Sequence, residues 1–401
     1  FQLNFDDSKW DDIHLPHDAS IGGDFDRENS TRANGWLPHG NGWYRKHFKL
    51  EEETKEKLIF IQFQGVYRDA EVYINGTYLG RHLNGYLGFE HEISKYVNFD
   101  KENVIAVNYD NTKKGTSRWY TGEGIYRDVW LVITDKIHIP RYGTYITTPV
   151  VNKNKATIKV ITDVANDYER KIGIELVTQI YNPDNEKVAE LNSVTPVHSG
   201  ETYKFIHEMD VDNPMLWSCE EPNVYKAISN VYYEGQLVDD YETTFGIRDI
   251  EFTVNRGLLV NGKQVIAKGG NIHHDLGCLG SAALEKGYER KLKRLKAMGC
   301  NSIRLSHNPH APVLLDVADR LGFLVFNEAY DKWTSQFYGG VESFEANWRE
   351  DLTTFIRRDR NHPSVYIWSM GNEVNKQHGR YDGKFETPAA GSDYGAGLYK
   401  R

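Results

Sequence analysis

In the last third of the chain, polar and charged side chains follow four short apolar runs, at the point where each run ends. Residues 365–369 form one such run, which leads into Asn372 and Glu373. A short run of large apolar and β-branched residues before a glycine predicts a buried strand. Groups able to bind a polar ligand, or to react with it, thus follow four predicted strands: Asn271 with His273, Arg304 with His307, Glu328, and Asn372 with Glu373.

Helical patterns lie between these runs. Residues 288–298 and 313–321 carry apolar side chains at helical spacing, each pattern is followed by a glycine, and a third helix is predicted over residues 344–360. Strands that alternate with helices build a parallel sheet with right-handed crossovers. The carboxyl ends of such strands meet at one edge, where barrel enzymes keep their catalytic groups.

A nucleotide-binding sheet and a barrel share this alternation. A doubly wound sheet would need a glycine-rich phosphate loop after its first strand, and Gly269-Gly270 does not match GxGxxG. An isolated Asn-Glu pair is more often a helix cap or a solvated loop acid, and a single histidine is more often structural. Four consecutive strand ends of this kind favour a barrel with an active site.

Two all-β domains are predicted before the barrel. Residues 1–135 hold short β-rich runs and an Asn75-Gly76 hairpin turn, which is typical of a jelly-roll sandwich. Residues 136–246 alternate apolar and polar side chains like an immunoglobulin-like sandwich, for which we expect a spacer role. The barrel segment is residues 247–401.

One loop of the first domain, residues 117–128, is polar, aromatic and rich in glycine. It either presents Arg118, Trp119 and Tyr120 to a ligand or packs them over the edge of the sandwich. The sequence leaves both readings open.

Composition and charge exclude several classes of protein. The net charge of −9 argues against nucleic acid or an anionic membrane surface as a partner. Cys219, Cys278 and Cys300 are too widely spaced for a disulfide framework or a CxxC metal site. No apolar run approaches the roughly 18 residues of a membrane span, so no membrane insertion is expected.

A start at Phe1 fits a mature secreted form or a chain trimmed at the front, and a periplasmic or secreted location is favoured over a cytoplasmic one.

Longer motifs resemble glycoside hydrolase family 2, the family of β-galactosidases, β-glucuronidases and β-mannosidases. Residues 301–309 followed by 319–325 look like one family signature, and residues 358–373 look like the other. Residues 65–76 and 124–129 are similar to segments of the family's N-terminal sugar-binding domain. The resemblance covers nearly the whole chain, which looks like the N-terminal half of such an enzyme.

The resemblance implies a jelly roll, an immunoglobulin-like sandwich and an α/β TIM barrel in that order, as the patterns above do. It also implies a retaining mechanism in which Glu373 is the general acid/base. Asn372 would hydrogen-bond the sugar 2-hydroxyl. The side chains that would line the sugar pocket are Arg304, His273 and His307.

Only the first half of the barrel is expected in this chain. A TIM barrel has eight strands and typically about 250 residues, whereas four strands fit between Val265 and Arg401, with a fourth helix beginning near Tyr394. In the family the nucleophilic glutamate ends the seventh strand, so it is expected beyond Arg401; Glu328 is expected to order the pocket instead. Because a half barrel leaves open sheet edges, Arg401 is interpreted as a truncation, a cleavage point or the end of a partial sequence.

No metal ion and no cofactor are expected. Some family members carry Glu-x-His after the third strand and bind a divalent ion beside the acid/base, whereas residues 327–334 here read NEAYDKWT. Trp333 in this segment is expected either to stack on a sugar ring as a substrate-binding residue or to pack at the barrel rim.

The expected function is that of a retaining exo-β-glycosidase acting on a carbohydrate substrate. β-Galactosides are favoured because residues 306–309, SHNP, resemble β-galactosidases more than the SHYP form of β-glucuronidases. The alternatives are a β-glucuronidase or another family 2 β-glycosidase, and, for the isolated chain, a non-catalytic carbohydrate-binding fragment. Whether the protein forms a homo-oligomer stays open.

Overall fold

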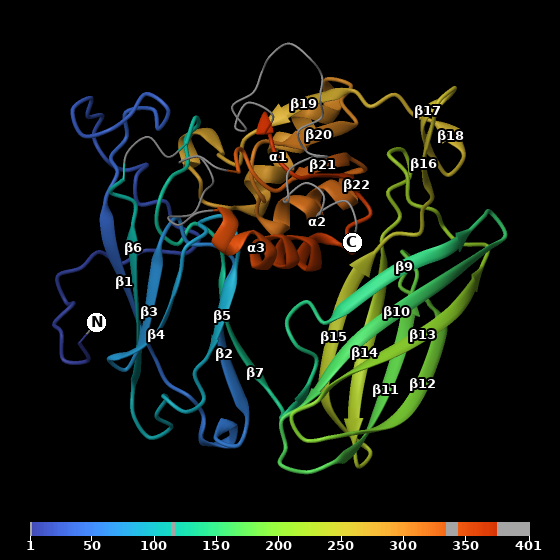
Figure 1. Cartoon of the computed structure of the whole chain (residues 1–401), viewed down its shortest axis with the longest axis horizontal. Helices are drawn as coiled ribbons and strands as arrows, with labels where there is room; N and C mark the ends of the chain where they lie inside the picture. Colours follow the sequence, from blue (N-terminus) through green and yellow to red (C-terminus); the bar gives the residue numbers. More distant parts are fainter. Residues whose placement is uncertain (1, 114–116, 334–343, 375–401) are drawn as a thin grey trace.

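The computed structural model describes residues 2–113, 117–333 and 344–374 (Figure 1). Two groups of antiparallel sheets come first, and a parallel sheet with α-helices follows them. This succession agrees with the predicted fold class, while the domain boundaries after residues 135 and 246 stay predictions. The helix predicted near Tyr394 lies outside the described residues, and none of the helices in the described ranges is long and apolar enough to cross a membrane.

The first group is a sandwich of two sheets, with strand orders β1-β6-β3-β4 and β5-β2-β7. Every second residue of β2 points inward, so Ile59, Ile61 and Phe63 enter one shared core. Asn75 and Gly76 have φ angles of 50° and 83°, which confirms the predicted hairpin turn. The strands are β1 (Asn41–Phe48), β2 (Leu58–Phe63), β3 (Ala70–Ile74), β4 (Thr77–His82), β5 (Phe89–Glu92), β6 (Asn103–Asp110) and β7 (Val129–Thr134); a short 3-10 turn, η1, spans Glu52–Thr54.

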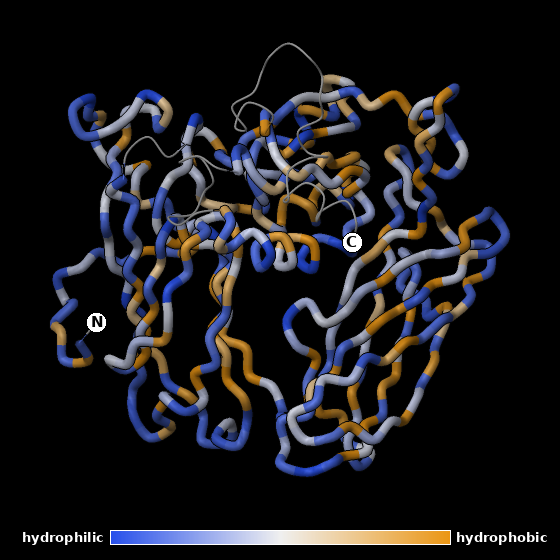
Figure 2. The backbone as a smooth tube through the Cα atoms, viewed as in Figure 1, coloured by the Kyte–Doolittle hydropathy of each residue, from blue (hydrophilic) through white to orange (hydrophobic). Residues whose placement is uncertain are grey.

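The second group is also a two-sheet sandwich. One sheet has the order β12-β11-β14-β15, and in the other β10 pairs with β13, β8 and β9. Hydrophobic and hydrophilic colours alternate along its strands in Figure 2, as expected for half-buried strands. The strands are β8 (Ile137–His138), β9 (Thr144–Val151), β10 (Lys155–Asn166), β11 (Ile172–Tyr181), β12 (Lys187–Val197), β13 (Thr202–Asp212), β14 (Tyr225–Tyr233) and β15 (Gln236–Phe245).

The third part contains the parallel sheet β19-β20-β21-β22, whose successive strands are connected by α1, α2 and α3. Its first strand begins at Gly269 and not at the predicted Val265, whose backbone N–H donates to the Leu258 carbonyl of β17 instead. The elements are β16 (Ile250–Thr253), β17 (Gly257–Val260), β18 (Lys263–Gln264), β19 (Gly269–Ile272), η2 (Gly277–Leu279), α1 (Glu285–Ala297), β20 (Ser302–Leu305), α2 (Pro312–Leu321), β21 (Leu324–Glu328), α3 (Phe344–Asp359) and β22 (Val365–Ser369).

The first sandwich packs directly against the parallel sheet and its helices. The buried guanidinium of Arg127 donates hydrogen bonds to the carbonyls of Tyr86 and Pro309, which belong to the two parts. Buried Asp18 accepts from the Tyr120 hydroxyl and from the backbone N–H and hydroxyl of Ser281. These contacts fix the loop after β6 at the carboxyl edge of the parallel sheet.

Gly122 lies at the closest approach of this junction. Its φ is 64°, and a Cβ atom there would lie 1.9 Å from Ser281 Oγ and 2.6 Å from Asp18 Oδ2. Gly280, on the barrel side, has φ 62°, and its Cβ would lie 2.2 Å from the same Asp18 oxygen. Both positions therefore require glycine, for space and for backbone conformation.

The start of β22 is anchored by a buried ion pair. His362 Nδ1 lies 2.6 Å from Asp319 Oδ2 on α2, and the backbone N–H of Ser364 donates to Asp319 Oδ1. Burial disfavours the charged imidazolium, but the Asp319 carboxylate outweighs burial and raises the pKa of His362 to about 9. The strand that leads to Glu373 is thus held at its beginning by a charged pair.

We predict that this ion pair stabilises the fold in a pH-dependent way. Because the folded-state pKa lies above the ordinary value of 6.5, the contribution is fully present below that pH and is lost as pH rises through about 9. His362→Gln should therefore cost roughly 2 kcal/mol near neutral pH, and much less in strongly alkaline solution.

The measurement is the thermal unfolding midpoint of wild type and variant across this pH range. His198→Gln, at an exposed position, is the matched control and should show no pH-dependent difference. A stability difference for His362→Gln that stays constant from acid to alkaline pH would contradict the prediction.

Candidate active site

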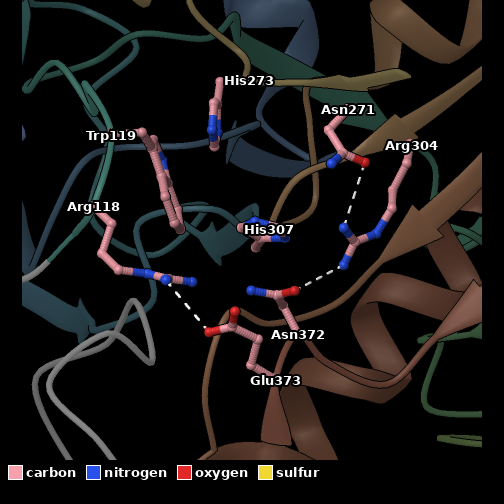
Figure 3. A pocket seen from close by; sticks show the side chains of 8 residues that line it. All are labelled: Arg118, Trp119, Asn271, His273, Arg304, His307, Asn372 and Glu373. Carbon is pink, nitrogen blue, oxygen red and sulfur yellow. Dashed lines mark hydrogen bonds and ion pairs between the residues drawn. The ribbon is translucent and has the colours of Figure 1, made fainter. Parts of the chain in front are cut away.

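A pocket of about 410 Å³ opens at the carboxyl ends of the parallel strands (Figure 3). The predicted acid/base and four of the predicted substrate-binding residues line it, together with two residues of the first sandwich and Asn271. The lining residues are Arg118, Trp119, Asn271, His273, Arg304, His307, Asn372 and Glu373.

Glu328, at the end of β21, holds much of this pocket in place. Its side chain is fully buried, and its Oε2 accepts hydrogen bonds from Arg304 Nη2 at 2.6 Å and from Ser369 Oγ at 2.7 Å. Its Oε1 lies 2.6 Å from His307 Nδ1. Since both carboxylate oxygens are engaged below the pocket, Glu328 orders neighbouring side chains, as the sequence predicts.

The two histidines of the pocket have defined orientations. His273 Nδ1 lies 2.9 Å from the Ser306 carbonyl, so this nitrogen carries a proton. Burial lowers the pKa of His273, which favours a neutral ring with Nε2 as an acceptor. Trp119 stacks on this ring with centroids 5.0 Å apart and meets His307 edge-on. The first sandwich thus supplies an aromatic wall to the pocket.

Asn372 is fixed at both ends of its amide. Its Oδ1 accepts from Arg304 Nη2 at 3.0 Å, and its Nδ2 donates to Asp331 Oδ1 at 2.9 Å. Its backbone N–H donates to the carbonyls of Tyr330 and Asp331. The side chain is therefore oriented before any ligand arrives.

Glu373 follows in a left-handed conformation, with φ 52°. Such a backbone is costly for a residue other than glycine and occurs preferentially at functional sites. The side chain is 40% exposed, and its Oε2 lies 2.8 Å from Lys332 Nζ and 3.4 Å from Arg118 Nη1. Figure 3 shows Arg118 reaching across the pocket toward this carboxylate.

Asp331 connects Arg118 to Asn372. It accepts from Arg118 Nε and Nη2 at 3.0 and 2.6 Å, in a two-point contact between the first sandwich and the barrel. Burial opposes ionisation of Asp331, but the donors Arg118 and Asn372 outweigh it and hold its pKa below the ordinary value. The roles of Asp331 and Lys332 were not predicted from the sequence, although a charged pair so soon after a strand end was an available signal.

The loop of residues 117–128 combines both of its predicted alternatives. Arg118 and Trp119 line the pocket, whereas the Tyr120 hydroxyl donates to Asp18 and packs in the domain junction. Trp333 is not among the lining residues. It is 3% exposed, its indole N–H donates to the Met370 carbonyl, and its ring stacks on Phe344. These are the contacts expected if Trp333 packs at the barrel rim and does not stack on a sugar ring.

The side chains around Glu373 do not fit a bound divalent ion. Two cationic groups, Lys332 and Arg118, already contact its Oε2. Within the described ranges, one cluster brings acids and a histidine within metal-ligand reach of one another, namely Asp316, Asp319 and His362. It lies at the start of β22, away from the pocket, and its histidine is paired with Asp319.

Three family models match consecutive stretches of the chain. Residues 30–135 match the sugar binding domain of glycosyl hydrolases family 2, residues 137–248 match a further domain of the same family, and residues 252–387 match its TIM barrel domain. Together they confirm the predicted succession of domain types.

Individual proteins are similar along almost the whole chain. A β-galactosidase of Bacteroides ovatus, BoGH2A, is 41% identical over 94% of this chain and 44% of its own length. A crystal structure of a glycosyl hydrolase family 2 member from Bacteroides cellulosilyticus has a TM-score of 0.88 at 40% identity, over 94% of this chain and 51% of that one. A Bacteroides uniformis β-glucuronidase has a TM-score of 0.83 at 30% identity, over 95% and 46%.

The chain spans about half the length of the relatives it matches. One assignment follows from the consecutive family matches, from the agreement in fold and from the pocket at the carboxyl edge of the parallel sheet. The chain belongs to glycoside hydrolase family 2.

Proposed function

We propose that the protein is a retaining exo-β-glycosidase with Glu373 as its general acid/base. The observation that carries the proposal is the position of Glu373, a partly exposed carboxyl at the end of the fourth parallel strand, in a pocket of hydrogen-bonding side chains. Ligand pockets range from roughly 300 to 1,000 Å³. A pocket of about 410 Å³ is small on that scale, which favours a terminal sugar unit as the substrate group.

The chemistry needs two carboxyl groups. In the first step the proton of Glu373 passes to the glycosidic oxygen as its bond to the anomeric carbon breaks, and a second carboxylate bonds to that carbon. In the second step Glu373 takes a proton from a water molecule whose oxygen attacks the anomeric carbon and displaces the second carboxylate. Asn372 would hold the sugar 2-hydroxyl, and the neutral His273 would accept from another hydroxyl.

Glu373 is the only carboxylate among the pocket-lining residues in the described ranges. Glu328 is unsuited to attack a sugar, because it is fully buried and engaged by Arg304, His307 and Ser369. A retaining enzyme places its nucleophile about 5–5.5 Å from the acid/base. We propose that this group comes from a part of the protein outside these residues.

We propose β-galactosides as the substrates. The SHNP segment at residues 306–309 supports this choice, as does the β-galactosidase of Bacteroides ovatus at 41% identity. A β-glucuronidase is the second candidate, and the Bacteroides uniformis enzyme at 30% identity favours it.

We predict that Glu373→Gln slows hydrolysis of unactivated substrates by about 10²–10⁴-fold, because general acid catalysis is lost. With an activated aryl glycoside, whose leaving group needs no proton, added azide should restore turnover and give a glycosyl azide. The rate loss with unactivated substrates and the azide rescue are both measured as kcat of the full-length protein. Glu251→Gln, at an exposed carboxyl of β16, should leave kcat unchanged; no azide rescue would count against the acid/base assignment.

We predict that kcat/KM for an aryl β-galactoside exceeds that for the matching aryl β-glucuronide by about tenfold or more, which corresponds to about 1.4 kcal/mol of transition-state binding. The two substrates are compared on one preparation. The reverse order would replace the galactosidase proposal by the glucuronidase one. Sugar binding seen by calorimetry, with turnover of neither substrate, would indicate a carbohydrate-binding protein.

We predict that Arg118→Lys lowers kcat by about tenfold or more, although the positive charge is kept. A lysine cannot reproduce the two-point contact with Asp331, so Asn372 and Glu373 lose a fixed neighbour. Arg32→Lys, at an exposed position of the first sandwich, is the control. Unchanged kinetics in Arg118→Lys would show that the first sandwich does not set the geometry of the acid/base.

A further inference from the structure

The amino group of Lys332 lies in a cage of three oxygen atoms. Its Nζ is 2.8 Å from Glu373 Oε2, 3.1 Å from the Asn372 carbonyl and 3.3 Å from Asp331 Oδ1. A lysine ammonium has three N–H donors, so each oxygen can receive one of them. The side chain of Lys332 is 10% exposed, which makes this a largely enclosed contact.

The cage has the ligand chemistry of a cation site. Carboxylate and carbonyl oxygens are the ligands that magnesium and calcium ions prefer. In this chain the positive charge is that of the Lys332 side chain, four residues after the end of β21. A divalent ion cannot enter this place while the ammonium of Lys332 fills it, because the ammonium takes the same oxygen ligands and would repel the ion.

We propose that Lys332 is a positioning residue that serves as a built-in cation beside the acid/base, so that this site works without a divalent ion. In this chain the ammonium fixes Glu373 Oε2. The proposal rests on the proposed glycosidase activity for its kinetic consequences. The cage itself does not depend on it.

Lys332 is one of several charged side chains near the Glu373 carboxyl. Others among the described residues are Arg118 from the loop after β6 and Asp331 from the segment after β21. Removing one cation favours the protonated form of the Glu373 carboxyl. Since Arg118 remains, the change is partial.

The kinetic test compares the full-length wild type with Lys332→Met, which keeps the length of the side chain without its charge. We expect kcat to fall by about 10–100-fold, and the alkaline limb of the kcat/KM profile to move to higher pH. Wild-type activity should be unaffected by EDTA and by added Mg²⁺. Lys293→Met, at an ion-paired surface lysine of α1, should behave like wild type.

The binding test uses Mn²⁺ as the probe and needs no activity. Lys332→Ala empties the oxygen cage and should bind Mn²⁺, measured by calorimetry and electron paramagnetic resonance, whereas wild type should not bind it at this site. Circular dichroism and the unfolding midpoint confirm that each variant is folded; if the alanine variant does not fold, Lys332→Ser takes its place.

Two results would overturn the proposal. One is a wild type that loses activity in EDTA and regains it with Mg²⁺, or that binds Mn²⁺ in a manner abolished by Glu373→Gln. The other is a folded Lys332→Met protein with the wild-type kcat and pH profile. If the wild type hydrolyses no glycoside, the proposed function fails, and the Mn²⁺ measurement still decides whether the ammonium occupies a cation site.

Discussion

The pocket depends on two buried carboxylates, Glu328 and Asp331, that are not among its lining residues. Glu328 holds Arg304, His307 and Ser369, and Asp331 holds Arg118, Asn372 and Lys332. A buried carboxylate must be paired and hydrogen-bonded, because an uncompensated charge in the interior costs several kcal/mol. That requirement forces the surrounding cations and amides into defined positions. The residues that line the pocket are thus oriented by residues that do not line it.

Asn372 and Arg304 join the two carboxylates into one network. Arg304 donates to Glu328 and to the Asn372 amide, whose other end donates to Asp331. The network therefore runs from β20 through the turn after β22 to the loop of the first sandwich. Removing a single partner would leave an unpaired buried group elsewhere in it, so we regard the site as a cooperative unit.

Much of the fold and part of the site were predictable from sequence, because both depend on local patterns. Apolar runs separated by helical periods gave the parallel sheet, and Glu373, Asn372 and His307 stood out as polar residues directly after such runs. The late start of the first strand, at Gly269, was not predictable, since Val265 instead donates to Leu258 next to a competing local hairpin of β17 and β18. Trp333 was ambiguous because its spacing does not show whether the ring faces a ligand or the core.

The remaining part of the site arises from contacts between distant segments. Arg118 and Asp331 are 213 positions apart in the chain, and their pairing exists only because the first sandwich docks on the parallel sheet. Local sequence patterns carry no information about such docking. Lys332 was missed for a related reason: its role depends on the turn at Glu373, which brings the carboxylate back over the segment after β21.

The glycines at the seam between the first sandwich and the barrel have an evolutionary consequence. A Cβ atom at Gly122 or at Gly280 would lie 2.6 Å or 2.2 Å from the same Asp18 oxygen, so neither position leaves room for a side chain. A mutation at either position would push the two parts of the protein away from each other and move Arg118 with them. Sequence drift should therefore be slow at these two sites, although neither touches a ligand, and recombination between family members would succeed only when both sides of the seam are inherited together.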